Sequence, residues 1–176
     1  MRRSISLGLT TAMAFAALGV ASPAEAHQPH PRSSPVPVMT YHKVGPDWKV
    51  RTISIDKNAN DEVAEENMYN EPPRSGYQYV IVRVRAKKYS SGEGDAWLDL
   101  NYNLYGKATH RYYDSGYQVI PDSFYDEPSV DRDGYVTGNI LFEVKKDDVA
   151  QRLRMVFEDT YDFEHETRVW FDTKPA

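Results

Sequence analysis

The sequence lacks several features that would tie it to a known chemistry. It contains no cysteine, which excludes disulfides, thiolate zinc sites, iron–sulfur clusters and thiol catalysis. The sequence also lacks an excess of positive charge, because its 21 basic side chains are outnumbered by 26 acidic ones and the net charge is −5. General binding to nucleic acid or to an anionic membrane needs a positive field, so neither partner is expected. The Gly-x-Ser-x-Gly, His-Glu-x-x-His and phosphate-loop motifs are missing too, so we expect no enzyme and no cofactor.

Only one long apolar run is present, and it lies at the N-terminus. Arg2 and Arg3 precede the apolar residues 5–20, and Ala24–Glu25–Ala26 forms an A-x-A processing site. This order is typical of a secretory signal peptide, and the run is shorter than the ~20 residues of a membrane span. We therefore predict that residues 1–26 are removed and that the mature protein is secreted and extracellular, with no integral membrane span. The arginine pair leaves the twin-arginine export route open beside the general one.

A proline-rich segment follows this leader. Five prolines fall within residues 27–46, and proline fixes φ and cannot donate a backbone hydrogen bond. The sequence therefore predicts an extended arm over residues 27–43 and a folded domain over residues 44–176. The arm has few apolar side chains to anchor it, so we expect removal of residues 27–37 to leave the fold intact. The mature chain carries a net charge of −6, because the leader takes away two arginines and one glutamate.

The dominant pattern after residue 44 has a period of two. Residues 79–86 place Val80, Val82 and Val84 on one face and two arginines on the other. Successive Cβ atoms of a strand point to opposite faces, so this alternation predicts a half-buried strand. Seven strands are predicted in all, over residues 48–55, 79–86, 97–104, 112–120, 140–144, 153–157 and 169–171. Seven short strands with little helix predict an all-β, antiparallel, immunoglobulin-like β-sandwich, with a closed barrel as the alternative.

The phases of these strands also predict the core and the irregular points. The expected core consists of Val82, Val84, Leu98, Leu100, Leu104, Ile140, Phe142, Val144, Leu153, Met155 and Phe157. In the first strand the phase slips between Val50 and Ile53, which predicts a β-bulge. The polar stretches 61–69 and 147–151 predict short helical turns.

Three segments carry a resemblance to a known family. They are Gly45–Pro46–Asp47–Trp48–Lys49–Val50, Gly76–Tyr77–Gln78–Tyr79–Val80–Ile81–Val82 and Asp133–Gly134–Tyr135–Val136–Thr137–Gly138–Asn139–Ile140–Leu141–Phe142–Glu143–Val144. Together they resemble the telokin-like, immunoglobulin-like domains of unknown function that actinobacteria secrete, a group that includes a secreted immunogenic antigen of mycobacteria. The resemblance implies an extracytoplasmic immunoglobulin-like sandwich without catalytic residues. The chain departs from it by lacking a lipobox cysteine and by having a tyrosine-rich middle.

Two patterns suggest metal sites. Cleavage after Ala26 would expose His27, whose α-amine and imidazole can chelate Cu(II) together, with His30 as a third nitrogen. Residues 131–134, Asp-Arg-Asp-Gly, resemble the first half of a calcium loop, but Ile140 stands where the closing glutamate belongs. We therefore expect residues 131–134 to form a hairpin turn with Gly134 in the left-handed conformation. A looser calcium site over residues 122–127 stays open.

The tyrosine-rich middle of the chain predicts a ligand surface. Exposed tyrosines bind glycans or peptides because their faces stack and their hydroxyls form hydrogen bonds. The candidates are Tyr112, Tyr113, Tyr117 and Tyr125. Tyr112 and Tyr113 are neighbours and cannot share one face of a strand, so one of them is expected to be exposed. The basic side chains at 83, 85 and 87 share the outward phase of one strand, where carboxylates are expected to pair with them.

Three functional hypotheses follow. The first is a secreted, non-catalytic immunoglobulin-like module that binds an extracellular protein or a cell-wall glycan. The second is an exported copper-binding protein that uses a free N-terminal His27. The third is a small secreted hydrolase with two paired carboxylates, which the abundance of Asp and Glu leaves open.

Overall fold

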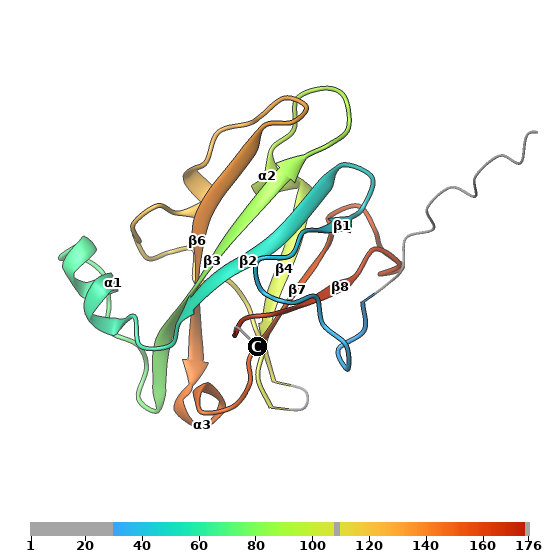
Figure 1. The fold of residues 1–176 in the computed structure, drawn as a ribbon. Helices are drawn as coiled ribbons and strands as arrows, with labels where there is room; N and C mark the ends of the chain where they lie inside the picture. The colour runs from blue at the N-terminus through green and yellow to red at the C-terminus, as the bar shows by residue number, and fades with distance from the viewer. Residues whose placement is uncertain (1–29, 108–109, 175–176) are drawn as a thin grey trace, which may run out of the picture.

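The computed structural model describes residues 30–107 and 110–174, which form two antiparallel sheets (Figure 1). The first sheet has the order β1-β2-β3-β6, with β1 (His42–Val44), β2 (Trp48–Asp56), β3 (Tyr77–Lys88) and β6 (Tyr135–Lys145). The second has the order β5-β4-β7-β8, with β5 (Arg111–Tyr112), β4 (Leu100–Tyr105), β7 (Arg154–Asp159) and β8 (Val169–Asp172). The prediction of an all-β antiparallel sandwich is confirmed. The closed-barrel alternative is wrong, because the described strands form two separate sheets.

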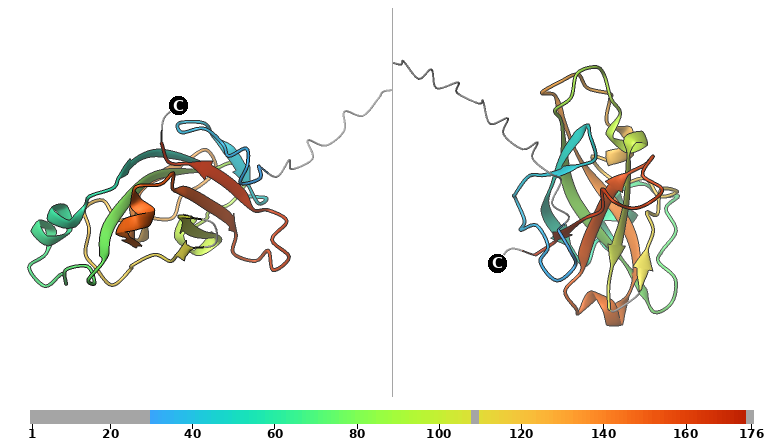
Figure 2. Two further views of the ribbon diagram at one scale, coloured as in Figure 1. Left: turned by 90° about the horizontal axis from the view of Figure 1, so that it is seen from below. Right: turned by 90° about the vertical axis from the view of Figure 1, so that its right-hand side faces the viewer.

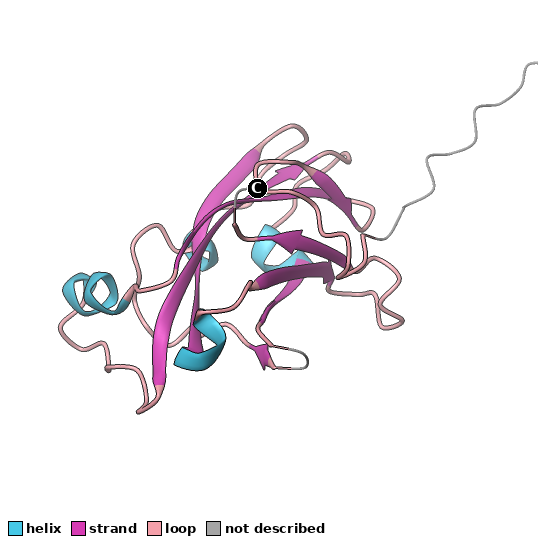
Figure 3. Cartoon of the chain, turned by 60° about the horizontal axis from the view of Figure 1, so that its bottom comes forward, coloured by secondary structure: helices cyan, strands magenta, loops and turns pink. Residues whose placement is uncertain are grey.

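The helical segments are short. They are α1 (Asn60–Glu66), α2 (Ala96–Asp99), the 3₁₀ turn η1 (Phe124–Asp126) and α3 (Lys146–Val149). Figure 3 shows them at the ends and edges of the strands. In the part of the chain that the structure describes, none of the helices has the length and apolar character of a membrane span. The helical turns predicted over residues 61–69 and 147–151 are confirmed by α1 and α3.

The central strand pairs are those of an immunoglobulin fold. β3 pairs with β6 in one sheet, β4 pairs with β7 in the other, and neither pair is consecutive in the chain. These two pairs correspond to the B–E and C–F neighbours of the immunoglobulin sandwich. Over the residues that the structure describes there are eight strands, where seven were predicted. The additional strand is β1, a hairpin partner of β2. The strand predicted over residues 112–120 is wrong beyond Tyr112, because β5 covers only Arg111–Tyr112.

The core lies between the inner faces of the two sheets, whose layers can be followed in the side views of Figure 2. Every member of the predicted core except Leu98 is buried. Phe157 of β7 packs edge-on against Phe171 of β8, with ring centroids 5.6 Å apart. The predicted bulge in β2 is confirmed by a shift of its register against β3 between Thr52 and Ser54.

Leu98 is exposed because the strand predicted over residues 97–104 begins as a helix. The side chain of Asp95 accepts hydrogen bonds from the backbone N–H groups of Trp97 and Leu98, which caps α2. This turn rotates Leu98 outward, and 53% of it is accessible to solvent. The strand proper starts at Leu100, from which point the predicted alternation holds.

A second, smaller hydrophobic cluster covers the outer face of the first sheet. It consists of Ala59, Val63, Tyr79, Ile81, Ile120 and Leu141. Val63 of α1 packs over β3, so that Tyr79 and Ile81 are buried on the face that the alternation places outward. The Tyr79 hydroxyl donates to the carbonyl oxygen of Glu71, which ties the loop after α1 to the sheet. Both faces of β3 are therefore covered at this end of the sandwich.

The predicted arm is part of the sandwich over its described residues, 30–43. Val36 is fully buried and forms a parallel bridge with Phe171. Its N–H donates to the Trp170 carbonyl oxygen (2.8 Å), and its carbonyl oxygen accepts from the Asp172 N–H (2.8 Å). The expectation of an arm that lies outside the domain is therefore wrong for these residues. Proline spacing predicts an extended conformation, but it carries no information about the β8 edge against which this segment packs.

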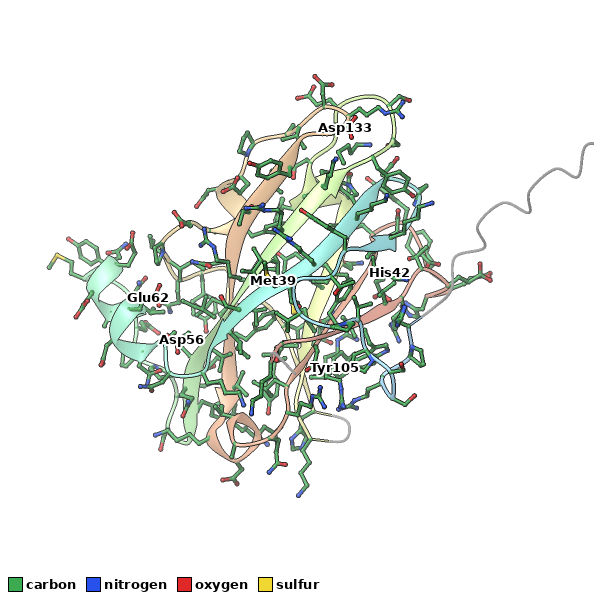
Figure 4. The ribbon with its side chains drawn as sticks, in the orientation of Figure 1. Met39, His42, Asp56, Glu62, Tyr105 and Asp133 are labelled. Carbon is green, nitrogen blue, oxygen red and sulfur yellow. The ribbon has the colours of Figure 1, made fainter. Side chains whose placement is uncertain are left out.

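The turn before β6, where Figure 4 labels Asp133, differs from the prediction in which residue is left-handed. Asp133 has a φ of 68°, whereas Gly134 does not adopt a positive φ. Aspartate tolerates this left-handed conformation better than most residues do. The Asp133 carboxylate also accepts a salt bridge from Lys87 (3.0 Å), and Arg83 pairs with Asp122 (3.0 Å) in the same way. Two members of the predicted basic stripe thus have carboxylate partners.

Candidate functional site

β6 is the last strand of the first sheet, and the segment 113–126 runs across its outer edge. A cleft of about 210 Å³ lies between this segment and the strand. The segment is joined to β6 at two points. The Ser115 N–H donates to the Leu141 carbonyl oxygen (2.9 Å), and the Asn139 N–H donates to the Asp122 carbonyl oxygen (2.7 Å). These attachments cover the edge of the sheet against pairing with another chain. The cleft lies between them.

Gly138 allows the far wall of the cleft to approach β6. A Cβ atom at this position would lie 2.5 Å from the Cα of Phe124, which is closer than real contacts permit. The absence of a side chain therefore lets η1 lie directly against the strand. Phe124 is buried in the core, which fixes the position of its neighbour Tyr125 at the mouth of the cleft.

The floor of the cleft contains an aspartate and a tyrosine. The hydroxyl of Tyr102, from β4, donates to the Asp114 carboxylate over 3.2 Å. The Tyr102 ring is held between Phe124 and Phe157, at centroid distances of 6.0 and 5.7 Å. Burial raises the pKa of the Asp114 carboxyl, because the charged form has lost part of its hydration. Burial raises the pKa of the Tyr102 hydroxyl too, and the nearby Asp114 charge adds to this effect.

Two of the predicted ligand-binding tyrosines stand at the mouth of this cleft. Tyr117 is 71% exposed and Tyr125 is 58% exposed, and both line the cavity. The Tyr125 ring packs edge-on against Trp97 of α2, with centroids 4.5 Å apart. This contact restricts the ring while leaving most of its surface open to a ligand. The fold therefore brings Tyr117 and Tyr125 to one site.

Tyr112 does not belong to an exposed surface. It is buried, and its hydroxyl donates to the carboxylate of Asp148 over 2.6 Å. The Nδ1–H of His110 donates to the same oxygen over 2.7 Å. Burial by itself would raise the pKa of Asp148, but the hydrogen bonds from Tyr112 and His110 outweigh it and hold the pKa below its usual value. Tyr112 is thus a structural residue, which corrects its place among the candidate ligand residues.

Replacing Tyr112 by phenylalanine is expected to lower the free energy of unfolding by about 1.5–3 kcal/mol, because a hydrogen bond to a charged group is lost. Tyr113→Phe is the matched control and should stay within about 0.5 kcal/mol of the wild type, since Tyr113 is exposed. Urea denaturation of the three proteins measures both values. The folded-state pKa of Asp148 is depressed, so its contribution is present above the unfolded pKa and is lost as the pH falls through the folded one. Equal losses in the two variants would contradict this role of Tyr112.

Tyr113 lines a different, open cleft. Its ring lies 4.5 Å from the Arg111 guanidinium, and Arg74 stacks on Tyr77 in the same way at 4.4 Å. Lys145 completes the basic lining of this cleft. The prediction that one member of the Tyr112–Tyr113 pair is exposed is confirmed, but Tyr113 does not line the cleft of Tyr117 and Tyr125.

The copper candidates lie at the start of the described chain. His27 lies outside the described residues. The Nδ1–H of His30 donates to the Ser34 carbonyl oxygen (3.0 Å), and its ring meets the ring of His42 edge-on at 4.5 Å. Figure 4 labels His42 on β1. The sequence gives no sign of this contact, because twelve positions separate His42 from His30. Over residues 30–107 and 110–174, no three His, Asp or Glu side chains gather in a metal-ligand arrangement.

Sequence reasoning missed Asp114. It is one of 26 acidic residues, and no motif or spacing marks it out. Its partner Tyr102 lies on β4 and packs against the core. The signal that identifies the pair is the desolvation of a carboxylate in a cleft, which exists only once the segment 113–126 has folded against β6.

Comparisons with known proteins show the fold. No known protein family matches this sequence, and no curated protein matches it either. A conserved hypothetical protein from Bacillus anthracis is similar in structure, with a TM-score of 0.54 and 13% identity over 78% of this chain and 95% of that one. An uncharacterized beta-sandwich protein from Clostridium difficile has a TM-score of 0.48 and 13% identity over 80% of this chain and 95% of that one.

Proposed function

We propose that this β-sandwich is a secreted, non-catalytic binding module that contacts an extracellular ligand through the cleft of Tyr117 and Tyr125. The observation that carries the proposal is the position of two exposed tyrosines at the mouth of a cleft with a packed floor. Aromatic side chains dominate binding energy in many interfaces, because they bury a large area at a small entropic cost. The resemblance to the telokin-like secreted domains supports the same function and implies no catalysis.

The size of the cleft favours a small ligand group. A volume of about 210 Å³ suits one sugar residue or one peptide side chain. A standard protein–protein interface covers roughly 800 Å² on each partner, whereas this cleft has room for one small group. We therefore favour a cell-wall glycan or its peptide branches as the ligand, reached by a module that the signal peptide over residues 1–26 directs out of the cell.

The double variant Tyr117→Ser and Tyr125→Ser is expected to lose binding to isolated cell-wall material of the producing organism by about thirtyfold or more. This estimate assumes that truncating an aromatic anchor costs roughly 2 kcal/mol. Its melting temperature should stay close to that of the wild type, because both side chains are exposed. A sedimentation assay with purified protein measures the bound fraction.

Tyr161→Ser is the matched control for this experiment. Tyr161 is also highly exposed, but it lies in the loop between β7 and β8 and does not line the cleft. We expect this variant to bind as the wild type does. If Tyr161→Ser abolishes binding and the double variant keeps it, the proposed site is wrong.

Copper binding is the second candidate function, and the contact between His30 and His42 favours it. Two imidazoles at the beginning of the described chain would add ligands to the α-amine and imidazole of a free His27. This function requires cleavage after Ala26. Mass spectrometry of the protein recovered from the culture medium identifies its first residue and so decides whether that amine is free.

A further inference from the structure

The cleft of Tyr117 and Tyr125 has an unbalanced charge. Its lining includes two carboxylates, Asp114 and Asp126, and none of its described lining residues is Lys, Arg or His. Arg74, which lies near Tyr117, is paired with Glu143 over 2.7 Å. The wall also binds Arg83, whose guanidinium donates to the Asn139 side chain. That guanidinium also forms a salt bridge with Asp122, so its charge is already compensated. The cleft therefore attracts positive charge.

Among the residues that line the cleft, Asp114 is the one whose ionised form a bound cation would stabilise most. It lies on the floor, where burial disfavours its ionised form. Among the described residues, its carboxylate accepts one side-chain hydrogen bond, from Tyr102 to Oδ2. The distance of 3.2 Å is long for a hydroxyl donor. A carboxylate has about four acceptor positions, so Asp114 can accept further donors from a ligand in the cleft.

The tyrosines at the mouth suit the same kind of ligand. The face of an aromatic ring attracts ammonium groups within about 6 Å of its centroid. Tyr117 and Tyr125 offer exposed rings in the same cleft as a carboxylate, and both kinds of group attract an ammonium ion. A neutral hydroxyl or amide would gain less, because it would not compensate the charge of Asp114.

We propose that this cleft selects ligands that carry a protonated primary amine, with the ammonium group hydrogen-bonded to Asp114 and placed beside Tyr117 and Tyr125. The inference rests on the proposed function and specifies its ligand. A primary amine can come from an amino sugar without its acetyl group or from a lysine-type side chain of a peptide. Both sources share the ammonium group, and the experiment below separates them.

The test compares two amines with their acetylated counterparts. The probes are a glucosamine tetramer against an N-acetylglucosamine tetramer, and Nα-acetyl-lysine amide against its Nε-acetylated form. At about pH 7, calorimetry with the mature protein should show binding of at least one free amine roughly tenfold or more tighter than its acetylated form. The pair that shows the difference identifies the source of the amine.

Asp114→Asn should remove this discrimination, because asparagine keeps an acceptor for Tyr102 but carries no charge. Asp147→Asn, an exposed acidic position in α3 outside the cleft, is the matched control and should keep it. Equal affinity for free and acetylated probes overturns the amine inference and leaves the binding module standing. The amine inference is also overturned if cell-wall binding depends on Tyr117 and Tyr125 but neither free amine binds. If the double variant Tyr117→Ser and Tyr125→Ser binds cell-wall material as the wild type does, the proposed function itself is overturned.

A stability measurement tests whether Asp114→Asn still folds. The titratable side chains around Asp114 are Tyr102 from β4, Asp126 from η1, Tyr117 and Tyr125. Because its folded-state pKa is raised, the charged form of Asp114 disfavours folding above its unfolded pKa. Asp114→Asn should therefore melt at a higher temperature than the wild type near pH 7. The difference should disappear as the pH falls through the raised pKa. If the variant has a lower melting temperature than the wild type at neutral pH, the Asp114 carboxylate already has a stabilising partner in the protein. The inference that it binds a cationic ligand would then be wrong.

Discussion

Replacement of Leu104 by alanine is expected to lower the free energy of unfolding by about 2–5 kcal/mol. Leu104 is fully buried in β4, where it is paired across the sheet with Met155 on one side and Tyr112 on the other. Three elements meet at this side chain, so the cavity left behind cannot collapse easily. A typical domain has a total stability of roughly 5–15 kcal/mol, and this loss would be a large share of it. Chemical denaturation followed by tryptophan fluorescence measures the change.

Leu98→Ala is the matched control for Leu104→Ala. The two leucines share one alternating pattern in the sequence, and the pattern predicts the same burial for both. In the structure Leu98 is exposed on α2, so its replacement should stay within about 0.5 kcal/mol of the wild type. If both variants lost the same stability, the strand would start before Leu98, and the helix capped by Asp95 would not form.

Removal of residues 27–37 from the mature protein is expected to destabilise the sandwich, in contrast to what the proline-rich sequence suggests. Burial of Val36 contributes about 1.5–3 kcal/mol. The truncated protein also loses its two backbone hydrogen bonds to β8, each worth about 0.5–1.5 kcal/mol. Thermal melts of the truncated protein should therefore show a fall of several degrees, because about 1 kcal/mol shifts the melting temperature by 2–4 °C or more at this size.

A pair of point variants separates the role of Val36 from the effect of shortening the chain. Val36→Ala should lower the free energy of unfolding by about 1.6 kcal/mol, since two buried methyl groups are lost at about 0.8 kcal/mol each. Val119→Ala should have little effect, because Val119 is about half exposed. A truncated protein that melts like the full chain would show that the segment before β1 is dispensable, as its prolines alone suggest.

The candidate site shows how far sequence reasoning reaches in this protein. The tyrosine-rich stretch pointed to Tyr117 and Tyr125, because exposed aromatic residues between strands are a local property. It also included Tyr112, whose burial depends on Asp148, a residue 36 positions away. Asp114 could not be found, because its altered environment comes from Tyr102 on another strand and from the path of residues 113–126 along β6.

The sequence by itself determined the fold class of this protein, the phase of most strands, the bulge in β2 and the positions of α1 and α3. These properties depend on side chains a few positions apart, and strand geometry converts their spacing into burial directly. The tertiary structure alone decided that Val36 completes the β8 edge, that His30 meets His42 and that Asp114 shares a cleft with Tyr117 and Tyr125. Each of these contacts joins segments through the packing of the two sheets or of a loop on a strand edge. The physical reason is that the free energy of such a contact depends on which surfaces are brought together, and local periodicity does not encode that choice.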